Sequence, residues 1–325
     1  MRKGSKCEGK TSHSLIERHA KAYERGASAS MKKKTMGNKL QIGVLLLPGL
    51  LIFGIFTVYP IFKLFIMSFF KWDFGSMLEQ QFIGMQNYKE VLGDTYFRTS
   101  FVNTLVYTLV TVPAQMILGL LVAVFINSIA HLKVSFRVLY YLPVITSWVI
   151  ASLVFKYIFN TEGMLNYFLT NVIHVTSQNI RWLDSRWSGL SVAMLLGTWK
   201  GIGWNMVVFL AALQTVPMEL YEVAGIDGAG TIKKFFHVTI PCIRGTILFA
   251  LVMLTIGGFN VFTSIKMITG GEPGHQTDTI LTWMYYKAFS TGKFGYSAAL
   301  SFIIAVCLAL LAALQFKLMK NNEKG

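Results

Sequence analysis

Six long runs of apolar residues constrain this chain more than any other feature of its sequence. Each run is longer than 20 residues, and a helix that rises about 1.5 Å per residue can then cross the roughly 30 Å of hydrocarbon in a bilayer. Because lipid offers the backbone no hydrogen-bond partners, each run has to be helical to span it. The expected spans are Gln41–Phe69, Phe101–Ile126, Val138–Phe159, Gly189–Leu213, Thr246–Met267 and Tyr296–Leu318.

The composition supports this expectation. Hydrophobic residues make up 54% of the chain and charged residues 14%, which is too apolar for a soluble domain. We therefore predict an all-α fold, a polytopic membrane bundle of six transmembrane helices. The predicted organisation is a basic tail at 1–40, the first transmembrane helix with an outer loop at 41–99, a membrane core at 100–318 that contains a cytoplasmic loop at 214–244, and a cytoplasmic end at 319–325.

Basic residues are unevenly shared between the two sides of the predicted bundle. The side of the amino terminus holds 19 Lys and Arg residues, 11 of them in the tail, and the other side holds 7. The positive-inside rule then places both termini in the cytoplasm. The chain has no nucleic-acid-binding motif, so the basic tail is interpreted as an orientation signal beside the lipid bilayer and not as a nucleic-acid site.

Nothing in the sequence indicates catalysis by this chain. It has no Gly-x-x-x-x-Gly-Lys-Ser/Thr phosphate loop, so we expect ATP to bind elsewhere. The histidines and cysteines considered as ligands lie in separate segments without metal-ligand spacing or paired spacing. They are Cys7, His131, His237, Cys242, His275 and Cys307. We expect free thiols, no catalytic residue, no metal site and no cofactor on this chain.

The polar loop at 214–244 separates the fourth and fifth apolar runs. Pro217 suits the first position of a helix, and Glu219 and Glu222 follow it, near the positive end of the helix dipole. Glycines should end this helix within a few residues. Of these, Gly228 is expected at a corner with positive φ.

A second short helix is predicted in the same loop. Thr231 is the expected N-cap of a helix that runs to His237. Pro241 is expected to stop the backbone before the fifth span. The predicted arrangement is helix, glycine corner, helix, at the membrane surface.

This loop resembles the EAA loop of ABC importer permeases. The residues in register are Glu222, Ala224, Gly228 and Pro241, with conservative departures at Val223, Val238 and Ile240. In that family the loop docks in a cleft of the ATP-hydrolysing subunit, where a carboxylate such as Glu222 would pair with a basic residue. The resemblance implies an ATPase-coupling role for Glu222, Val223, Ala224, Asp227, Gly228 and Pro241. The alternative is an ordinary amphipathic connection between two helices.

Further matches are spread along residues 41–318. They are Phe82–Gly84 and Asn87–Tyr88 after the first span, Phe136–Arg137 and Leu142–Pro143 at the third, Trp199 and Gly201 in the fourth, Phe259–Asn260 in the fifth, and Gly270–Gly274 with Thr279 after it. Together they resemble the sugar-importer branch of the ABC permeases, although Glu272 departs from that branch's pattern. The resemblance implies a type I importer permease fold and the F-type half of a heterodimer.

The resemblance also implies partners and a location. The expected partners are a second permease subunit, two ATPase subunits that carry ATP and Mg, and an extracytoplasmic solute-binding protein. The expected location is a prokaryotic cell membrane. The predicted function is transport of a sugar or oligosaccharide across it.

Lys200 is the ionisable residue that lies deep within a predicted span. Burying it there costs a few kcal/mol on insertion scales unless it faces a partner or a wet cavity. Two explanations stay open: its ammonium contacts substrate, or it pairs with a backbone carbonyl or a carboxylate of a partner helix. By register from Glu222, the resemblance to maltose-type permeases places the substrate path at Gly197, Lys200, Gly201, Trp204, Leu254, Gly257 and Gly258.

Other functions remain possible at this point. Within the same class, the chain could import glycerol phosphate, amino acids or metal, and a lysine in the path leaves an anionic sugar open. In a different class, it could be a secondary transporter without an ATPase, but the inverted repeats typical of that class are not evident. A non-transporting membrane scaffold is the third class.

Overall fold

The computed structural model describes residues 41–73, 81–129 and 131–321. The predicted basic tail at 1–40 and the last residues, 322–325, lie outside this part of the chain. Helices account for nearly all of the regular structure that is described. The strands there are β1 (Phe70–Lys71) and β2 (Gln81–Phe82), which pair antiparallel with Phe70 opposite Phe82. The all-α prediction is confirmed.

The helices follow one another with short connections. In chain order the α-helices are α2 (Tyr59–Met67), α3 (Gln86–Gly93), α4 (Thr95–Ser128), α5 (Lys133–Ile145), α6 (Trp148–Ile158), α7 (Met164–Tyr167), α8 (Arg186–Leu213), α9 (Met218–Ile226), α10 (Thr231–Lys234), α11 (Ile240–Cys242), α12 (Arg244–Phe259), α13 (Thr263–Ile268), α14 (Ile280–Tyr285) and α15 (Phe294–Asn321). The π-helical segments are η1 (Gly54–Val58), η3 (Phe168–Val172), η4 (Phe235–Thr239) and η5 (Tyr286–Ser290).

Five helical stretches of the described chain are long and apolar enough to cross a membrane. They are Gln41–Met67, Thr95–Ser128, Arg186–Leu213, Arg244–Ile268 and Phe294–Lys317. The bent pair α5 and α6 supplies a sixth if it is counted as one span. Each predicted span therefore has a helical counterpart.

The third span, predicted at Val138–Phe159, is sharply bent near its middle, which the sequence did not indicate. Helices α5 and α6 meet at an angle of 89°. Thr146 and Ser147, between them, have extended backbone with ψ of 137° and 135°. The break is not visible in the sequence, because only these two residues with small polar side chains interrupt the apolar run.

The fifth span is also interrupted. Helix α12 ends at Phe259, and the chain passes through Asn260–Phe262 before α13 begins at Thr263. The Thr279 hydroxyl donates to the Val261 carbonyl at 3.0 Å, so the following loop satisfies a backbone group that the break frees.

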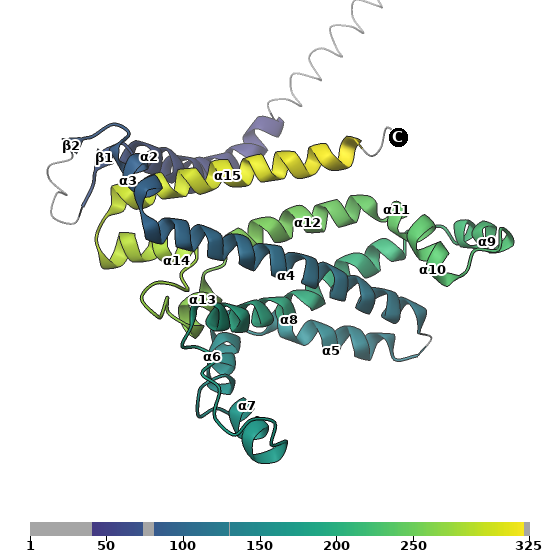
Figure 1. Ribbon diagram of the computed structural model, residues 1–325. Helices are drawn as coiled ribbons and strands as arrows, with labels where there is room; N and C mark the ends of the chain where they lie inside the picture. Colours follow the sequence, from purple (N-terminus) through teal and green to yellow (C-terminus); the bar gives the residue numbers. More distant parts are fainter. Residues whose placement is uncertain (1–40, 74–80, 130, 322–325) are drawn as a thin grey trace, which may run out of the picture. The chain divides into compact units, whose positions relative to one another are not determined.

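The chain divides into two compact units, 1–64 and 65–325. In the first unit the described residues, 41–64, are helical and include η1, and their apolar side chains are mostly exposed. In the second unit α4 is central, since α8, α12 and α14 all contact it, and α5 packs on α8 (Figure 1).

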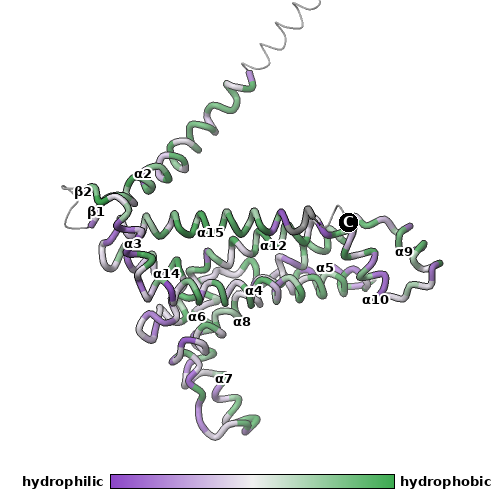
Figure 2. Tube along the Cα trace, turned by 45° about the horizontal axis from the view of Figure 1, so that its top comes forward, coloured by the Kyte–Doolittle hydropathy of each residue, from purple (hydrophilic) through white to green (hydrophobic). Residues whose placement is uncertain are grey.

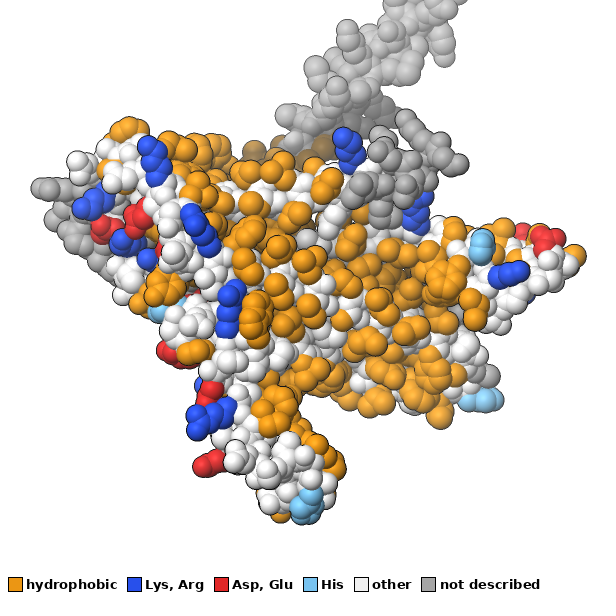
Figure 3. Space-filling model, viewed as in Figure 1, with side chains coloured by type: hydrophobic (Ala, Val, Ile, Leu, Met, Phe, Trp, Pro, Cys, Tyr) orange, Lys and Arg blue, Asp and Glu red, His pale blue; other side chains and the backbone are white. Residues whose placement is uncertain are grey.

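Within the second unit, chain segments gather at two opposite ends. Helices α9, α10 and α11 lie at one end, together with the connection between α4 and α5 and the last turns of α15, while α3 and α14 lie at the other (Figures 1 and 2). Apolar side chains cover the face between the ends, and charged side chains are concentrated toward them (Figure 3). On α4, for example, Leu109, Ile117 and Leu121 are exposed. This distribution is typical of a helical bundle that crosses a bilayer.

Candidate functional site

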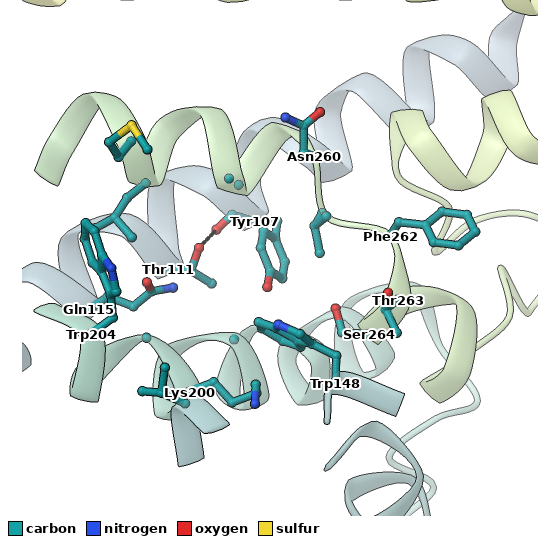
Figure 4. A pocket seen from close by; sticks show the side chains of 18 residues that line it. Tyr107, Thr111, Gln115, Trp148, Lys200, Trp204, Asn260, Phe262, Thr263 and Ser264 are labelled. Atoms are coloured by element: carbon teal, nitrogen blue, oxygen red, sulfur yellow. Dashed lines mark hydrogen bonds between the residues drawn. The ribbon is translucent and has the colours of Figure 1, made fainter. Parts of the chain in front are cut away.

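A cavity of about 490 Å³ lies between α4, α8, α12 and α13, beside the first residue of α6 (Figure 4). This volume is within the range of small-molecule sites. The structure brings all seven residues of the predicted substrate path to its wall. They are Gly197, Lys200, Gly201 and Trp204 on α8 and Leu254, Gly257 and Gly258 on α12.

The four glycines in this wall have different structural roles. A Cβ at Gly197 would overlap the Tyr107 hydroxyl, and one at Gly201 would overlap the Gln115 side chain. These two glycines therefore allow α8 to approach α4 closely, as Gly258 allows α12 to approach Thr108. Gly257 differs from them, because the space where its Cβ would lie is open.

Helix α4 supplies a polar side of the cavity that the sequence interpretation missed. Tyr107, Thr111 and Gln115 line it, as do Trp148 from α6 and Ser264 from α13. A signal for the α4 residues was present in the sequence. The buried polar and tyrosine positions of α4 recur every three or four residues, at Asn103, Thr104, Tyr107, Thr108, Thr111 and Gln115. That spacing places them on one face of the helix.

The cavity wall combines aromatic rings with groups that can form hydrogen bonds. The indoles of Trp148 and Trp204 and the ring of Tyr107 are labelled in Figure 4. The Thr111 hydroxyl donates to the Tyr107 carbonyl at 2.8 Å. The Gln115 amide has no hydrogen-bond partner in the described part of the chain, although the residue is only 8% exposed. It is therefore available to a bound molecule.

The Lys200 ammonium is bonded to backbone. Its Nζ donates to the carbonyls of Pro143 and Thr146, each at 2.6 Å. It also lies 4.8 Å from the centroid of the Trp148 ring, within cation–π range, and the residue is 3% exposed. The sequence left two explanations for Lys200 open, contact with substrate or pairing with a neighbouring helix. The structure shows the second, in the form of hydrogen bonds to backbone carbonyls.

The 214–244 loop carries an exposed helix at the α9 end of the second unit. Glu222 lies in the middle of α9, and its exposed carboxylate makes no hydrogen bond or ion pair within the described residues. Tyr221, one residue earlier, anchors the helix, because its hydroxyl lies 2.9 Å from the Thr239 hydroxyl. The helix is therefore attached through Tyr221, and Glu222 next to it stays accessible.

The corner after α9 has the predicted geometry. Gly228 has φ of +73°, where a side chain is disfavoured, and the Ala229 N–H donates to the Ala224 carbonyl at 2.9 Å. Val223 and Asp227 are exposed and Ala224 is half-buried. The structure thus places these predicted coupling residues on α9 or at its end, whereas Pro241 lies apart from them in α11.

Three details of the loop prediction are wrong. Pro217 is the N-cap and precedes the first helical residue, Met218. Gly230, with extended backbone, is the N-cap of α10, so Thr231 is its first residue. Pro241 does not stop the backbone, because it lies in the first turn of α11, where its missing N–H costs little.

Exposed apolar side chains accompany Glu222 on α9. Met218 is 70% exposed, Val223 57% and Ile226 87%. A short polar loop has no internal need for such residues at its surface. A cluster of this kind marks a surface that contacts another molecule or the membrane.

The motif around Asn87, which follows the first predicted span, has a structural explanation. The Asn87 amide donates to the carbonyls of Ser68 and Phe70 at 2.8 and 2.9 Å. The Tyr88 hydroxyl lies 2.8 Å from the Ser68 hydroxyl. Gly84, with φ of +57°, makes the turn that precedes α3. The motif therefore fastens the chain after α2 to α3.

The glycine-rich segment after α13 is held by α4. The Asn103 amide donates to the carbonyls of Gln276 and Asp278 at 2.7 and 2.6 Å, and Arg186 of α8 donates to the Asn103 oxygen at 2.9 Å. His275 lies 2.8 Å from the Asp278 carboxylate. Burial raises the pKa of that carboxyl, and the histidine opposes the shift.

The fold and the cavity together indicate a class of protein, a multi-pass membrane transport subunit, with a cavity among its helices and an exposed helix at one end. The chain belongs to the family described as the binding-protein-dependent transport system inner membrane component, whose sequence profile matches residues 97–322. This membership confirms the predicted relationship to the ABC importer permeases.

Individual relatives cover most of the chain. It is 31% identical over 290 residues to the probable ABC transporter permease protein YurN of Bacillus subtilis (strain 168), covering 88% of this chain and 98% of that protein. It is 34% identical over 284 residues to the arabinooligosaccharides transport system permease protein AraP of the same organism, covering 86% and 88%.

The fold itself is also found in a solved structure. One chain of a bacterial ABC transporter involved in the import of the acidic polysaccharide alginate matches with a TM-score of 0.76 at 22% identity, covering 89% of this chain and 98% of that one. The match confirms the predicted type I importer permease fold.

Proposed function

We propose that this chain forms part of the translocation path of an ATP-driven importer for a sugar or oligosaccharide. The observation that carries the proposal is the cavity wall, where Trp148, Trp204 and Tyr107 are combined with the unpartnered amide of Gln115. Sugar rings present C–H patches that stack on aromatic faces and hydroxyls that bond to amides. AraP, a relative over most of the chain, is named for arabino-oligosaccharides.

The energy source is a separate subunit. Two ATPase subunits would bind ATP and Mg, and one of them would dock on α9 of this chain, with Glu222 pairing with a basic side chain of its cleft and Val223 and Ile226 making apolar contacts. Their exposure in the single chain supports this arrangement. A second, similar permease subunit would complete the path.

The orientation follows from the same assignment. The α9 end of the second unit faces the cytoplasm with both termini, and the end that carries α3 and α14 faces outward. There the solute-binding protein, which the family description requires, would deliver its ligand. Closure of the ATPase pair would draw the two α9 helices together and turn the cavity outward, in an alternating-access cycle.

The test is transport by the purified assembly. The chain is co-expressed with its partner permease and an ATPase, reconstituted in liposomes, and supplied with the binding protein and labelled arabino-oligosaccharide. We expect uptake that requires both ATP and the binding protein. Uptake without an ATPase would support a secondary transporter, and ATP-dependent uptake of amino acids or glycerol phosphate in place of saccharides would contradict the sugar assignment.

A further inference from the structure

The bend between α5 and α6 needs an explanation within the membrane. The last carbonyls of a helix have no partner in the helix itself, and in lipid they cannot bond to water. Two of them, at Leu142 and Pro143, and the carbonyl of the C-cap Thr146 are satisfied at the end of α5. The Thr146 hydroxyl donates to Leu142 at 3.0 Å, and the Lys200 ammonium donates to Pro143 and Thr146.

Lys200 is well placed for this function. A cation at the carboxyl end of a helix is favoured by the helix dipole, and the two carbonyls lie on either side of the last helical residues of α5. A neighbouring glycine permits the approach, because a Cβ at Gly203 would overlap the Tyr140 carbonyl of α5. The sequence of α8 thus holds both the cap and the space for the capped helix.

The bend determines where Trp148 lies. Trp148 is the first residue of α6, two positions after Thr146. In the view of Figure 4 its indole lies between the Lys200 ammonium and the side chains of Tyr107 and Thr111. Two of the three ammonium donors are therefore bonded to carbonyls, and the Trp148 ring lies 4.8 Å from the Nζ.

Lys200 is also the one charged residue among the described residues that line the cavity. With its ammonium occupied, the wall consists of rings, hydroxyls, an amide and apolar groups. A carboxylate or phosphate on a substrate would find, in this subunit's part of the path, a cation that already donates to two carbonyls, and burying a poorly paired charge is costly.

We propose that Lys200 is a positioning residue: it caps α5 inside the membrane, fixes the bend that holds Trp148 in the cavity wall, and leaves a path suited to uncharged saccharides. The substrate part rests on the proposed function. The capping part does not, because it concerns only contacts within this chain.

The capping part is tested by a distance between α5 and α6. Spin labels at Val138 and Tyr157, which are 56% and 72% exposed, report on the bend in the assembled complex. A straight helix would separate these positions by about 28 Å, and the 89° bend shortens the separation.

We expect K200M, which keeps the side-chain length but cannot donate, to broaden the distance distribution toward longer values and to lower the maximal uptake rate at least tenfold. K200R, which can donate to both carbonyls, should keep the wild-type distance distribution and uptake rate. The matched control is K266M, since Lys266 also lies over an aromatic ring, 5.6 Å from the Tyr285 centroid, and should leave the distance unchanged. An unchanged distribution in K200M would overturn the capping function.

The substrate part is tested with arabinotriose and trigalacturonate as a neutral and an anionic probe. We expect the wild-type complex to transport the first and not the second. Transport of trigalacturonate by the wild type that K200M selectively abolishes would show that the ammonium contacts substrate, and would overturn the inference. If neither saccharide is transported, both the proposed function and the substrate class fail, while the label distance still decides the capping function.

Discussion

At the scale of single residues, Glu222 is the side chain whose surroundings depend most on a partner. Its carboxylate is exposed on α9 and unpaired within the described chain. We predict that E222A abolishes uptake while the permease still inserts and folds. One charge-assisted hydrogen bond is worth about 1.5–3 kcal/mol, so the ATPase should bind about ten- to a hundredfold more weakly.

The measurement is co-purification of the ATPase and its stimulation by the loaded binding protein. E219A is the matched control, because Glu219 lies one turn earlier on the same helix and should have a smaller effect. Full stimulation of ATP hydrolysis in purified E222A would show that the 214–244 loop is only a connection.

Two glycines of the cavity wall, Gly201 and Gly257, are expected to differ in how an alanine substitution changes the stability of the complex. We predict that G201A lowers the melting temperature of the complex, because its Cβ would overlap the Gln115 side chain, and overpacking costs about 1–3 kcal/mol. G257A should leave the melting temperature unchanged, because its Cβ enters open space, and should instead lower the uptake rate. Equal melting temperatures for G201A and G257A would contradict this division.

At the scale of elements, Asn103 of α4 holds the loop after α13 through two backbone carbonyls. We predict that N103L exposes the backbone of residues 276–279, because it removes the donors to the Gln276 and Asp278 carbonyls. Amide hydrogen exchange in that segment should accelerate about tenfold, as expected for a loss of about 1.4 kcal/mol.

The control for that experiment is T99V. The Thr99 hydroxyl bonds only to the Thr95 carbonyl of its own helix, at 3.1 Å, so its loss should not change exchange at residues 276–279. If N103L exchanged at the wild-type rate, the loop would be held by its other contacts.

The elements also show what could be predicted from sequence and what could not. Apolar runs located every span, because their length and hydropathy are local properties. The α5–α6 bend was missed because it depends on Lys200, which is distant in the sequence and supplies the bonds that Pro143 and Thr146 lose. The resemblance to maltose-type permeases located the substrate path in the spans that flank the 214–244 loop and did not include the polar face of α4, although its helical periodicity is visible in the sequence.

For the candidate site, too, the sequence predicted some properties and not others. Register from Glu222 predicted which α8 and α12 positions line the cavity, since helical periodicity carries over from a motif to its neighbours. It could not predict what these residues do there. That Gly201 faces Gln115 while Gly257 faces open space depends on how α4 packs, which no single segment encodes.

At the scale of the whole molecule, the orientation in the membrane is the property most directly open to test. We predict that single cysteines at Gln178 and Gly274, both exposed, react with an impermeant maleimide from outside intact cells. Cysteines at His131 and Lys233, also exposed, should react only after the cells are opened. The native Cys242 and Cys307 are replaced beforehand, together with Cys7. Outside reaction at position 233 would reverse the assignment.

The exposure of Ile226, 87%, has a consequence for how the complex is made in the cell. A permease synthesised before its ATPase would expose this apolar end of α9 to water, together with Met218 and Val223. Chaperones and proteases recognise exposed apolar surfaces of this kind. We therefore expect surplus, orphaned copies to be short-lived. Subunit stoichiometry would then be set after translation, by which copies find a partner in time.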